Sequence, residues 1–255
     1  MKKNLTLNRP VFEQQAFDSS ALTVLATLFH RFVEPADYDL TVRRDDRVIH
    51  RASVRVAAEG APSQLNLDLA KLGGEPACAR EGAPVYTLAA GGVLGLYASA
   101  GVGRYAVTIV RLDQREKRIV LDSARAVPAG DLFAVTLVRP GLYQALTVGD
   151  QGRGKGELRV ALPKEGDKLR VDQATLIELG DQGLLRPDAA KLFSGQSVVF
   201  QCKLPTRIQV QLVKPDDAIT GGGSGGGTPP PVGPGRPPRG EPIRVRREVI
   251  TRDHR

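Results

Sequence analysis

Short runs of alternating apolar and polar residues recur along most of the chain. The alternation is clearest around Asp45-Asp46, with Leu40 and Val42 before this pair and Val54 after it. A period of two broken by turn-forming residues predicts a β-hairpin over residues 37–57. Further strands are predicted at residues 64–69, 85–88, 92–98, 105–112, 118–121, 197–203 and 206–213.

Residues 18–33 have a different pattern. Ala21, Leu25 and Phe29 are among apolar residues at three- and four-residue spacings, serines stand at the start, and Pro35 follows the end. This spacing predicts one amphipathic helix. The alternative is a strand, because Thr23 and Thr27 are β-branched.

Residues 186–195 also have two interpretations. Pro187 at a first helical position, Asp188 in the first turn and Gly195 after the end favour a short helix. The segment reads equally well as a strand that leads into the apolar run at 197–203.

Composition supports a mainly β protein. The chain has 255 residues with 41% hydrophobic but only 5% aromatic residues and no Trp, so Val, Leu, Ile and Ala must form the core. The 28 Gly and 18 Pro indicate many turns. Short strands without long helices between them favour antiparallel β-sandwiches, either one or two. Residues 38–42 (YDLTV) resemble residues 105–109 (YAVTI), a hint of two similar sheets.

Five segments are expected along the chain. They are a lead-in with the helix at 1–35, a first sandwich part at 36–100, a second part at 101–217, a Gly/Pro linker at 218–242 and a basic arm at 243–255. The linker, GGGSGGGTPPPVGPGRPPRGEP from Gly221, combines flexible glycine with stiffer proline-rich sequence.

One stretch resembles a known family. Residues 133–143 (FAVTLVRPGLY), a glycine-rich loop and residues 156–160 (GELRV) are similar to the last two strands of the cupredoxins, the blue-copper β-sandwiches, and residues 187–200 are similar to another part of that pattern. Immunoglobulin-like sandwiches share these motifs. The resemblance implies a β-sandwich. Residues 144–157, where the family has copper ligands, contain no Cys, His or Met, so a copper-less scaffold is expected.

The sequence offers no catalytic, cofactor-binding or metal-binding set of residues. Its three histidines, His30, His50 and His254, lie on unrelated segments, and Cys78 and Cys202 have no metal-ligand spacing, although one disulfide between them is conceivable. No cofactor is expected, and the protein is predicted not to be an enzyme.

Two literal motif matches have simpler interpretations. Residues 149–156 nearly spell a phosphate-binding loop, but Gly156 replaces the hydroxyl residue and a strand follows instead of a helix. A hairpin loop is predicted. Residues 222–226 (GGSGG) match a hydrolase nucleophile motif in letters only, because Ser224 lies in a glycine linker.

The net charge of +8 is concentrated at one end. Residues 221–255 carry seven Arg against three acids, a net +4, and the rest of the excess is spread over the body. No apolar stretch reaches transmembrane length and no signal peptide follows the basic start, so a cytoplasmic protein without a membrane span is expected, with signal-less export left open.

The arm has an amphipathic pattern, with β-branched residues between arginines. We expect it to dock as an added strand on a sheet edge of another copy or another protein. The alternatives are a disordered tail and an arm that binds nucleic acid or an anionic surface. The predicted partner-binding residues are Ile243, Arg244, Val245, Arg246, Arg247, Val249, Ile250 and Arg252.

The function predicted from the sequence is therefore that of a non-enzymatic structural or assembly protein. A small-molecule or carbohydrate-binding module is the alternative from another class, although an exposed aromatic platform is not evident.

Overall fold

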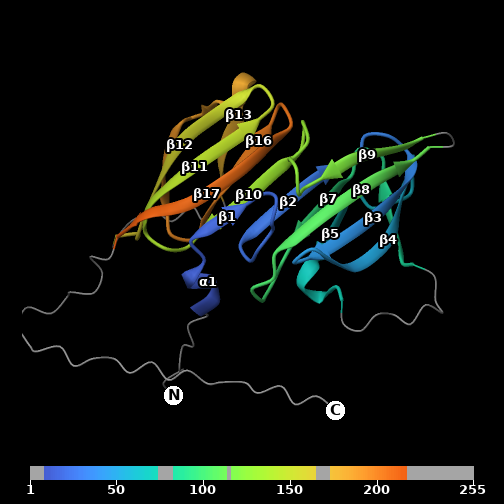
Figure 1. Ribbon diagram of the computed structural model, residues 1–255, viewed down its shortest axis with the longest axis horizontal. Coiled ribbons are helices and arrows are strands. Elements are labelled where there is room, and N and C mark those ends of the chain that lie inside the picture. Colours follow the sequence, from blue (N-terminus) through green and yellow to red (C-terminus); the bar gives the residue numbers. More distant parts are fainter. Residues whose placement is uncertain (1–8, 74–82, 114–115, 165–172, 217–255) are drawn as a thin grey trace, which may run out of the picture. The chain divides into compact units, whose positions relative to one another are not determined.

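The computed structural model describes residues 9–73, 83–113, 116–164 and 173–216. Residues 1–218 form one compact unit, and residues 219–255 lie outside the described residues. The described part is mainly β, with one short α-helix, α1 (Arg9–Glu13), two 3-10 helices, η1 (Leu69–Lys71) and η2 (Asp181–Gly183), and three sheets (Figure 1).

The strands divide into two five-stranded sheets and one seven-stranded sheet. Sheet 1 has the order β6 (Val85–Ala89), β4 (Arg47–Ala57), β3 (Ala36–Arg44), β8 (Tyr105–Leu112), β9 (Lys117–Asp122). Sheet 2 has the order β1 (Ala16–Asp18), β17 (Thr206–Pro215), β11 (Gly141–Gly149), β12 (Gly152–Ala161), β15 (Ala189–Phe193). The shared sheet has the order β14 (Leu185–Arg186), β13 (Thr175–Leu179), β16 (Gln196–Cys202), β10 (Leu132–Leu137), β2 (Ala26–Arg31), β7 (Val93–Tyr97), β5 (Gln64–Asp68).

The strand pairing reveals an internal structural duplication. We call residues 26–112 repeat A and residues 132–215 repeat B. The two repeats have the same order and pairing of strands. The corresponding strands are β2 and β10, β3 and β11, β4 and β12, β5 and β13, β6 and β15, β7 and β16, and β8 and β17. Every strand pair within repeat A has a counterpart of the same direction in repeat B, including two parallel pairs in each. The repeats meet where β2 pairs antiparallel with β10, with Leu28 opposite Phe133.

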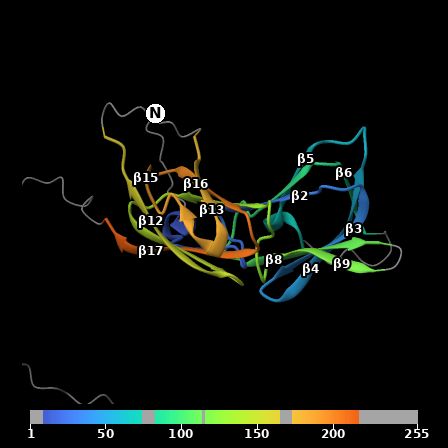
Figure 2. The same cartoon turned by 90° about the horizontal axis from the view of Figure 1, so that it is seen from above.

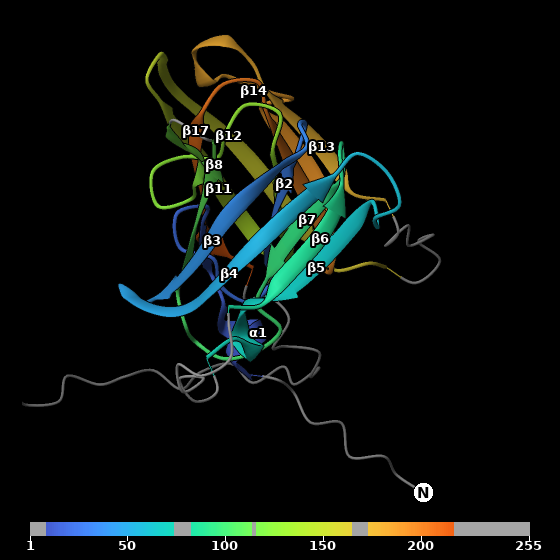
Figure 3. The same cartoon turned by 90° about the vertical axis from the view of Figure 1, so that its right-hand side faces the viewer.

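The parallel strand pairs show that the fold differs from the predicted antiparallel sandwich. From β4 to β7 the chain alternates between sheet 1 and the shared sheet, and each strand lies parallel to the strand two places earlier (Figures 2 and 3). Such winding is typical of a β-solenoid rather than of the antiparallel sandwich that the sequence predicts. The mainly β class is confirmed, and the purely antiparallel arrangement is wrong.

The predicted helix over residues 18–33 is also wrong. This segment contains the last residue of β1 and all of β2, and its even-numbered residues from Leu22 to Phe32 are buried while the odd-numbered ones are not. The segment crosses between the two repeats, and both cover it. Alternate residues are therefore buried, and the chain forms extended structure although the apolar residues also have a helical spacing. The strand alternative for residues 186–195 is confirmed by β14 and β15.

Several local predictions are confirmed. The hairpin at 37–57 is β3–β4, and Asp45 and Asp46 have φ of 47° and 68°, as a two-residue hairpin turn with two positive φ values requires. The phosphate-loop lookalike is the β11–β12 hairpin. The resemblance between residues 38–42 and 105–109 does not mark two sheets, because β3 and β8 are neighbours in sheet 1.

The segments that lead into each repeat are shared between the two repeats. β1 pairs with β17 of repeat B, whereas Leu22, a few residues later, bridges to Tyr105 of repeat A. β9 correspondingly pairs with β8 of repeat A, and Val127 bridges to Thr206 of repeat B. Each leading segment therefore ties both repeats together.

Two buried serines complete these bridges in the same way. The Ser19 hydroxyl accepts from the Ile208 N–H at 3.0 Å, and the Ser123 hydroxyl accepts from the Val107 N–H at 2.8 Å. Each Ser N–H donates in return to the carbonyl of the same partner, at 2.9 Å. One hydrophobic core extends through both repeats.

Candidate functional site

The arm residues predicted to bind a partner, from Ile243 to Arg252, lie outside the described residues, and so does Cys78. Cys202 is a free, buried thiol in the described part. Burial, together with the nearby Asp131, raises the pKa of this thiol to about 12, so at neutral pH it is protonated and a poor nucleophile.

In the part of the chain that the structure describes, two strand edges that correspond in the duplication have no strand beside them. β6 and β15 each end a five-stranded sheet. In repeat A, Pro84 accepts from Ser53 and the Ala90 N–H donates to Ala57, so even-numbered residues bond to β4. In a parallel ladder the residues in between direct their main-chain N–H and C=O groups away from the paired strand. The main-chain groups of Val85 and Thr87 therefore face away from β4.

The β15 edge has the same geometry. Asp188 accepts from the Glu157 N–H at 2.7 Å and the Ser194 N–H donates to Ala161 at 2.9 Å. The outward-facing residues are therefore Ala189, Lys191 and Phe193. An edge of this kind can accept an extended peptide through main-chain hydrogen bonds.

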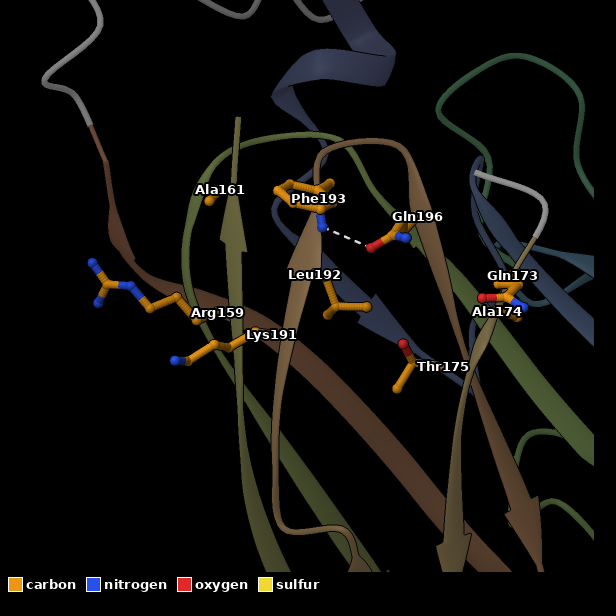
Figure 4. A pocket seen from close by; sticks show the side chains of 9 residues that line it. All are labelled: Arg159, Ala161, Gln173, Ala174, Thr175, Lys191, Leu192, Phe193 and Gln196. Atoms are coloured by element: carbon orange, nitrogen blue, oxygen red, sulfur yellow. Dashed lines mark hydrogen bonds between the residues drawn. The ribbon is translucent and has the colours of Figure 1, made fainter. Parts of the chain in front are cut away.

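A pocket of about 630 Å³ lies beside β15 (Figure 4). Figure 4 shows Arg159 and Lys191 on one side of β15, and Leu192, Thr175 and Gln196 on the other. Its lining comes from β12, β13, β15 and β16 and from the residues just before β13: Arg159, Ala161, Gln173, Ala174, Thr175, Lys191, Leu192, Phe193 and Gln196. Among the described residues, this lining combines apolar side chains with two cations and includes no acid.

The two cations at this pocket have no ion-pair partner among residues 9–73, 83–113, 116–164 and 173–216. In repeat A the residue that corresponds to Arg159 is Arg55, which binds Asp37 at 3.0 Å. Leu142 stands opposite Arg159 where Asp37 stands opposite Arg55. Among the described residues, Arg159 therefore has no acid in the place where Arg55 has Asp37.

A second cavity, of about 320 Å³, reaches the interface between the repeats. Here His30 Nδ1 lies 2.7 Å from Asp131 Oδ2, both side chains are buried, and Asp131 also accepts from the Arg31 N–H at 3.2 Å. A His–Asp pair is one part of a hydrolase triad. The described residues that line this cavity include no Ser, Thr or Cys, and the Cys202 thiol lies outside its lining.

The glycines of the β11–β12 hairpin are required by packing. An added Cβ on Gly154 would lie 2.1 Å from the Gly183 carbonyl oxygen, and one on Gly156 would lie 2.8 Å from that of Asp188. The Thr147 hydroxyl donates to the Gly183 carbonyl and accepts from the Gly154 N–H, which fixes this close approach. The motif that resembles a phosphate-binding loop is therefore explained by backbone contact.

Sequence reasoning missed the β15 pocket and the His30–Asp131 pair, because both are built from distant residues. A signal for the duplication was present: Val33-x-Pro35-x-x-Tyr38 recurs as Val138-x-Pro140-x-x-Tyr143. In both copies the tyrosine hydroxyl donates to the carbonyl four residues earlier, Glu34 at 3.0 Å and Arg139 at 2.9 Å.

No family model matches the chain, and the comparisons with curated proteins and with solved structures also return no match. Within the described ranges, no group of three or more His, Cys, Asp and Glu side chains is arranged to hold a metal ion. None of the helices in these ranges has the length and apolar character needed to cross a membrane.

Proposed function

We propose that the protein is a non-enzymatic assembly protein in which residues 243–255 of one copy dock as an added strand on another copy. The observation that supports this proposal is the open edge of β6, where the main-chain groups of Val85 and Thr87 face away from sheet 1. The alternating β-branched residues of the arm suit such an extended, hydrogen-bonded conformation.

Charge favours the β6 edge over the β15 edge as the site for this arm. The segment 221–255 carries a net +4, and β15 presents Lys191 beside Arg159, neither of which has an acidic partner in the described ranges. At β6 the corresponding residues are Thr87 and the neutralised Arg55. Like charges on facing strands are destabilising, so the basic arm binds better to repeat A.

The proposal is tested by mass photometry of the full-length protein, of a version that ends at Asp217, and of the variant Thr87→Pro. Proline removes the outward-facing N–H and is tolerated on an edge strand. We expect oligomers from the native full-length chain and from the matched control Lys191→Pro, and none from the truncated protein or from Thr87→Pro.

Thr87→Lys is a second variant that retains the strand and places a cation where repeat B has one. It should weaken assembly without changing the circular dichroism spectrum. If the truncated protein assembles as well as the full chain, or if Thr87→Pro and Thr87→Lys both assemble normally, the arm does not dock at β6.

The other functions considered from the sequence remain predictions. A carbohydrate-binding module would use a platform of aromatic side chains, and among the described residues that line the β15 pocket Phe193 is the one aromatic residue. Nucleic-acid binding would rest on the arm. The resemblance to cupredoxin-like or immunoglobulin-like proteins and the cytoplasmic location also remain predictions.

A further inference from the structure

The two repeats differ in the space beside the edge strand, which is β6 in repeat A and β15 in repeat B. In repeat A the linker between β4 and β5 closes this space, because the Pro62 carbonyl accepts from the Ala89 N–H and the Ser63 carbonyl accepts from the Val93 N–H, each at 2.9 Å. In repeat B most of the corresponding linker, residues 165–172, lies outside the described residues, and a pocket of about 630 Å³ lies beside β15 among the residues that the structure describes.

A side chain in repeat B makes the hydrogen bond that a peptide carbonyl makes in repeat A. Phe193 corresponds to Ala89, and its N–H donates to Gln196 Oε1 at 2.7 Å (Figure 4). Gln196 corresponds to Gly92, where an added Cβ would meet the Ser63 carbonyl oxygen at 3.0 Å and that of Ala89 at 2.7 Å. The Gln196 amide therefore stands in for backbone that repeat A supplies from its own linker.

The two sides of β15 differ in chemistry. Arg159 and Lys191 lie on one side, whereas the other side has Leu192, which is buried, and Thr175 (Figure 4). Side chains of an added strand alternate between the two sides of a sheet. A strand added at β15 would therefore place every second side chain next to the cations and the others over Leu192.

We propose that the β15 pocket of repeat B is the docking site for an extended peptide segment of a partner protein in which acidic and apolar residues alternate. The peptide bonds through its main chain to Ala189 and Lys191 and displaces the Gln196 amide from the Phe193 N–H. Its carboxylates bind Arg159 and Lys191. The basic arm of this chain lacks the complementary charge, so this site is distinct from the β6 edge and does not depend on the arm.

The test uses the full-length protein and three fluorescein-labelled peptides in an anisotropy titration. The probes are acetyl-Glu-Val-Glu-Val-Glu-Val-amide, its lysine counterpart with Lys for each Glu, and a peptide of residues 243–255. We expect saturable binding of the acidic peptide and none of its lysine counterpart, whereas the 243–255 peptide should bind at β6 and lose this binding in Thr87→Pro. Stronger binding of the lysine counterpart than of the acidic peptide, or binding of the 243–255 peptide that Thr87→Pro leaves unchanged but Arg159→Glu/Lys191→Glu strengthens, would overturn the proposal, since the occupant of β15 would then be a basic strand.

Charge-reversal variants test whether the acidic peptide binds at the surface of repeat B. The double variant Arg159→Glu/Lys191→Glu should weaken binding of the acidic peptide by about tenfold or more, because two partly exposed ion pairs are replaced by repulsion. Arg55→Glu is the matched control in repeat A and should leave the affinity unchanged. Equal affinity for the double variant and the native protein would refute the site.

Two further variants separate this site from the proposed arm site. Gln196→Ala removes the internal competitor and should tighten binding of the acidic peptide, whereas weaker binding would contradict the displacement of Gln196. Thr87→Pro, which should abolish assembly, should leave this affinity unchanged. A loss of peptide binding in Thr87→Pro would place the peptide at β6 and reject the β15 pocket.

Discussion

Repeats A and B have the same strand pairing but differ in what surrounds it. Repeat A closes the space beside β6 with the linker carbonyls of Pro62 and Ser63, and neutralises Arg55 with Asp37. In the described part of repeat B a pocket lies beside β15, the Phe193 N–H donates to Gln196 Oε1, and Leu142 stands opposite Arg159. The common strand pairing determines the hydrophobic core of both repeats. Residues on the surface and beside the edge strands can therefore differ between the repeats, and in one repeat they can form a binding surface.

The interface between the repeats also departs from their symmetry. β2 and β10 pair around Leu28 and Phe133, so positions on either side of this pair should match. On one side Ala26 lies opposite Val135, both apolar and buried, and on the other side His30 contacts Asp131. One half of the interface is thus packed by apolar contact and the other by a buried polar pair.

The largest effect is expected from breaking that polar pair. Asp131→Ala leaves buried His30 and the Arg31 N–H without their acceptor and should lower the free energy of unfolding by about 3–5 kcal/mol. Urea unfolding followed by circular dichroism measures the change. The double variant His30→Val/Asp131→Ala copies the Val135–Ala26 pair and should recover most of the loss. If the double variant is as unstable as Asp131→Ala, the pair does more than satisfy two buried groups.

A smaller effect is expected where repeat B alone needs glycine. Gly154→Ala forces a Cβ against the Gly183 carbonyl oxygen at 2.1 Å and should cost about 3 kcal/mol. Repeat A accommodates His50 at the corresponding position. Gly60→Ala is the control, because its Cβ would meet nothing within 4 Å and its positive φ of 77° should cost only about 1 kcal/mol. Equal losses in thermal unfolding would show that the close approach is not rigid.

The smallest of these effects concerns the two leading segments. Burial raises the pKa of Asp18, but hydrogen bonds from Arg207, Ser20 and Gln209 outweigh it and hold the pKa at about 2, below the ordinary 3.8. A depressed pKa means that the stabilisation is present above pH 4 and is lost as pH falls through 2. The shift corresponds to about 2 kcal/mol.

Asp18→Asn should therefore lower stability at neutral pH by about 2 kcal/mol and flatten its dependence between pH 2 and 4. Asp122 corresponds to Asp18, but its buried Oδ1 has no hydrogen-bond partner in the described part of the chain, and its ion pair is with the exposed Arg125. Asp122→Asn should change stability by less than about 0.5 kcal/mol. Equal slopes of stability against pH for both variants would contradict this difference.

Part of the fold followed from local sequence. The β3–β4 hairpin, β8 and β17 were predicted within a few residues, because alternation and turn residues such as Asp45-Asp46 act over short distances. Residues 18–33 were misread as a helix because apolar residues occur there at both spacings. Only the contact of the segment with both repeats buries every second residue.

The sequence by itself determined the mainly β class, most strands and the two hairpins, since each depends on residues close together in the chain. Tertiary structure decided which strands are neighbours, how the leading segments are shared, and that β15 borders a pocket while β6 does not. These features depend on contacts between distant residues, such as His30 with Asp131 and Arg207 with Asp18. Burial of one common core selects these contacts, and local periodicity carries no information about which distant strand will cover a given face.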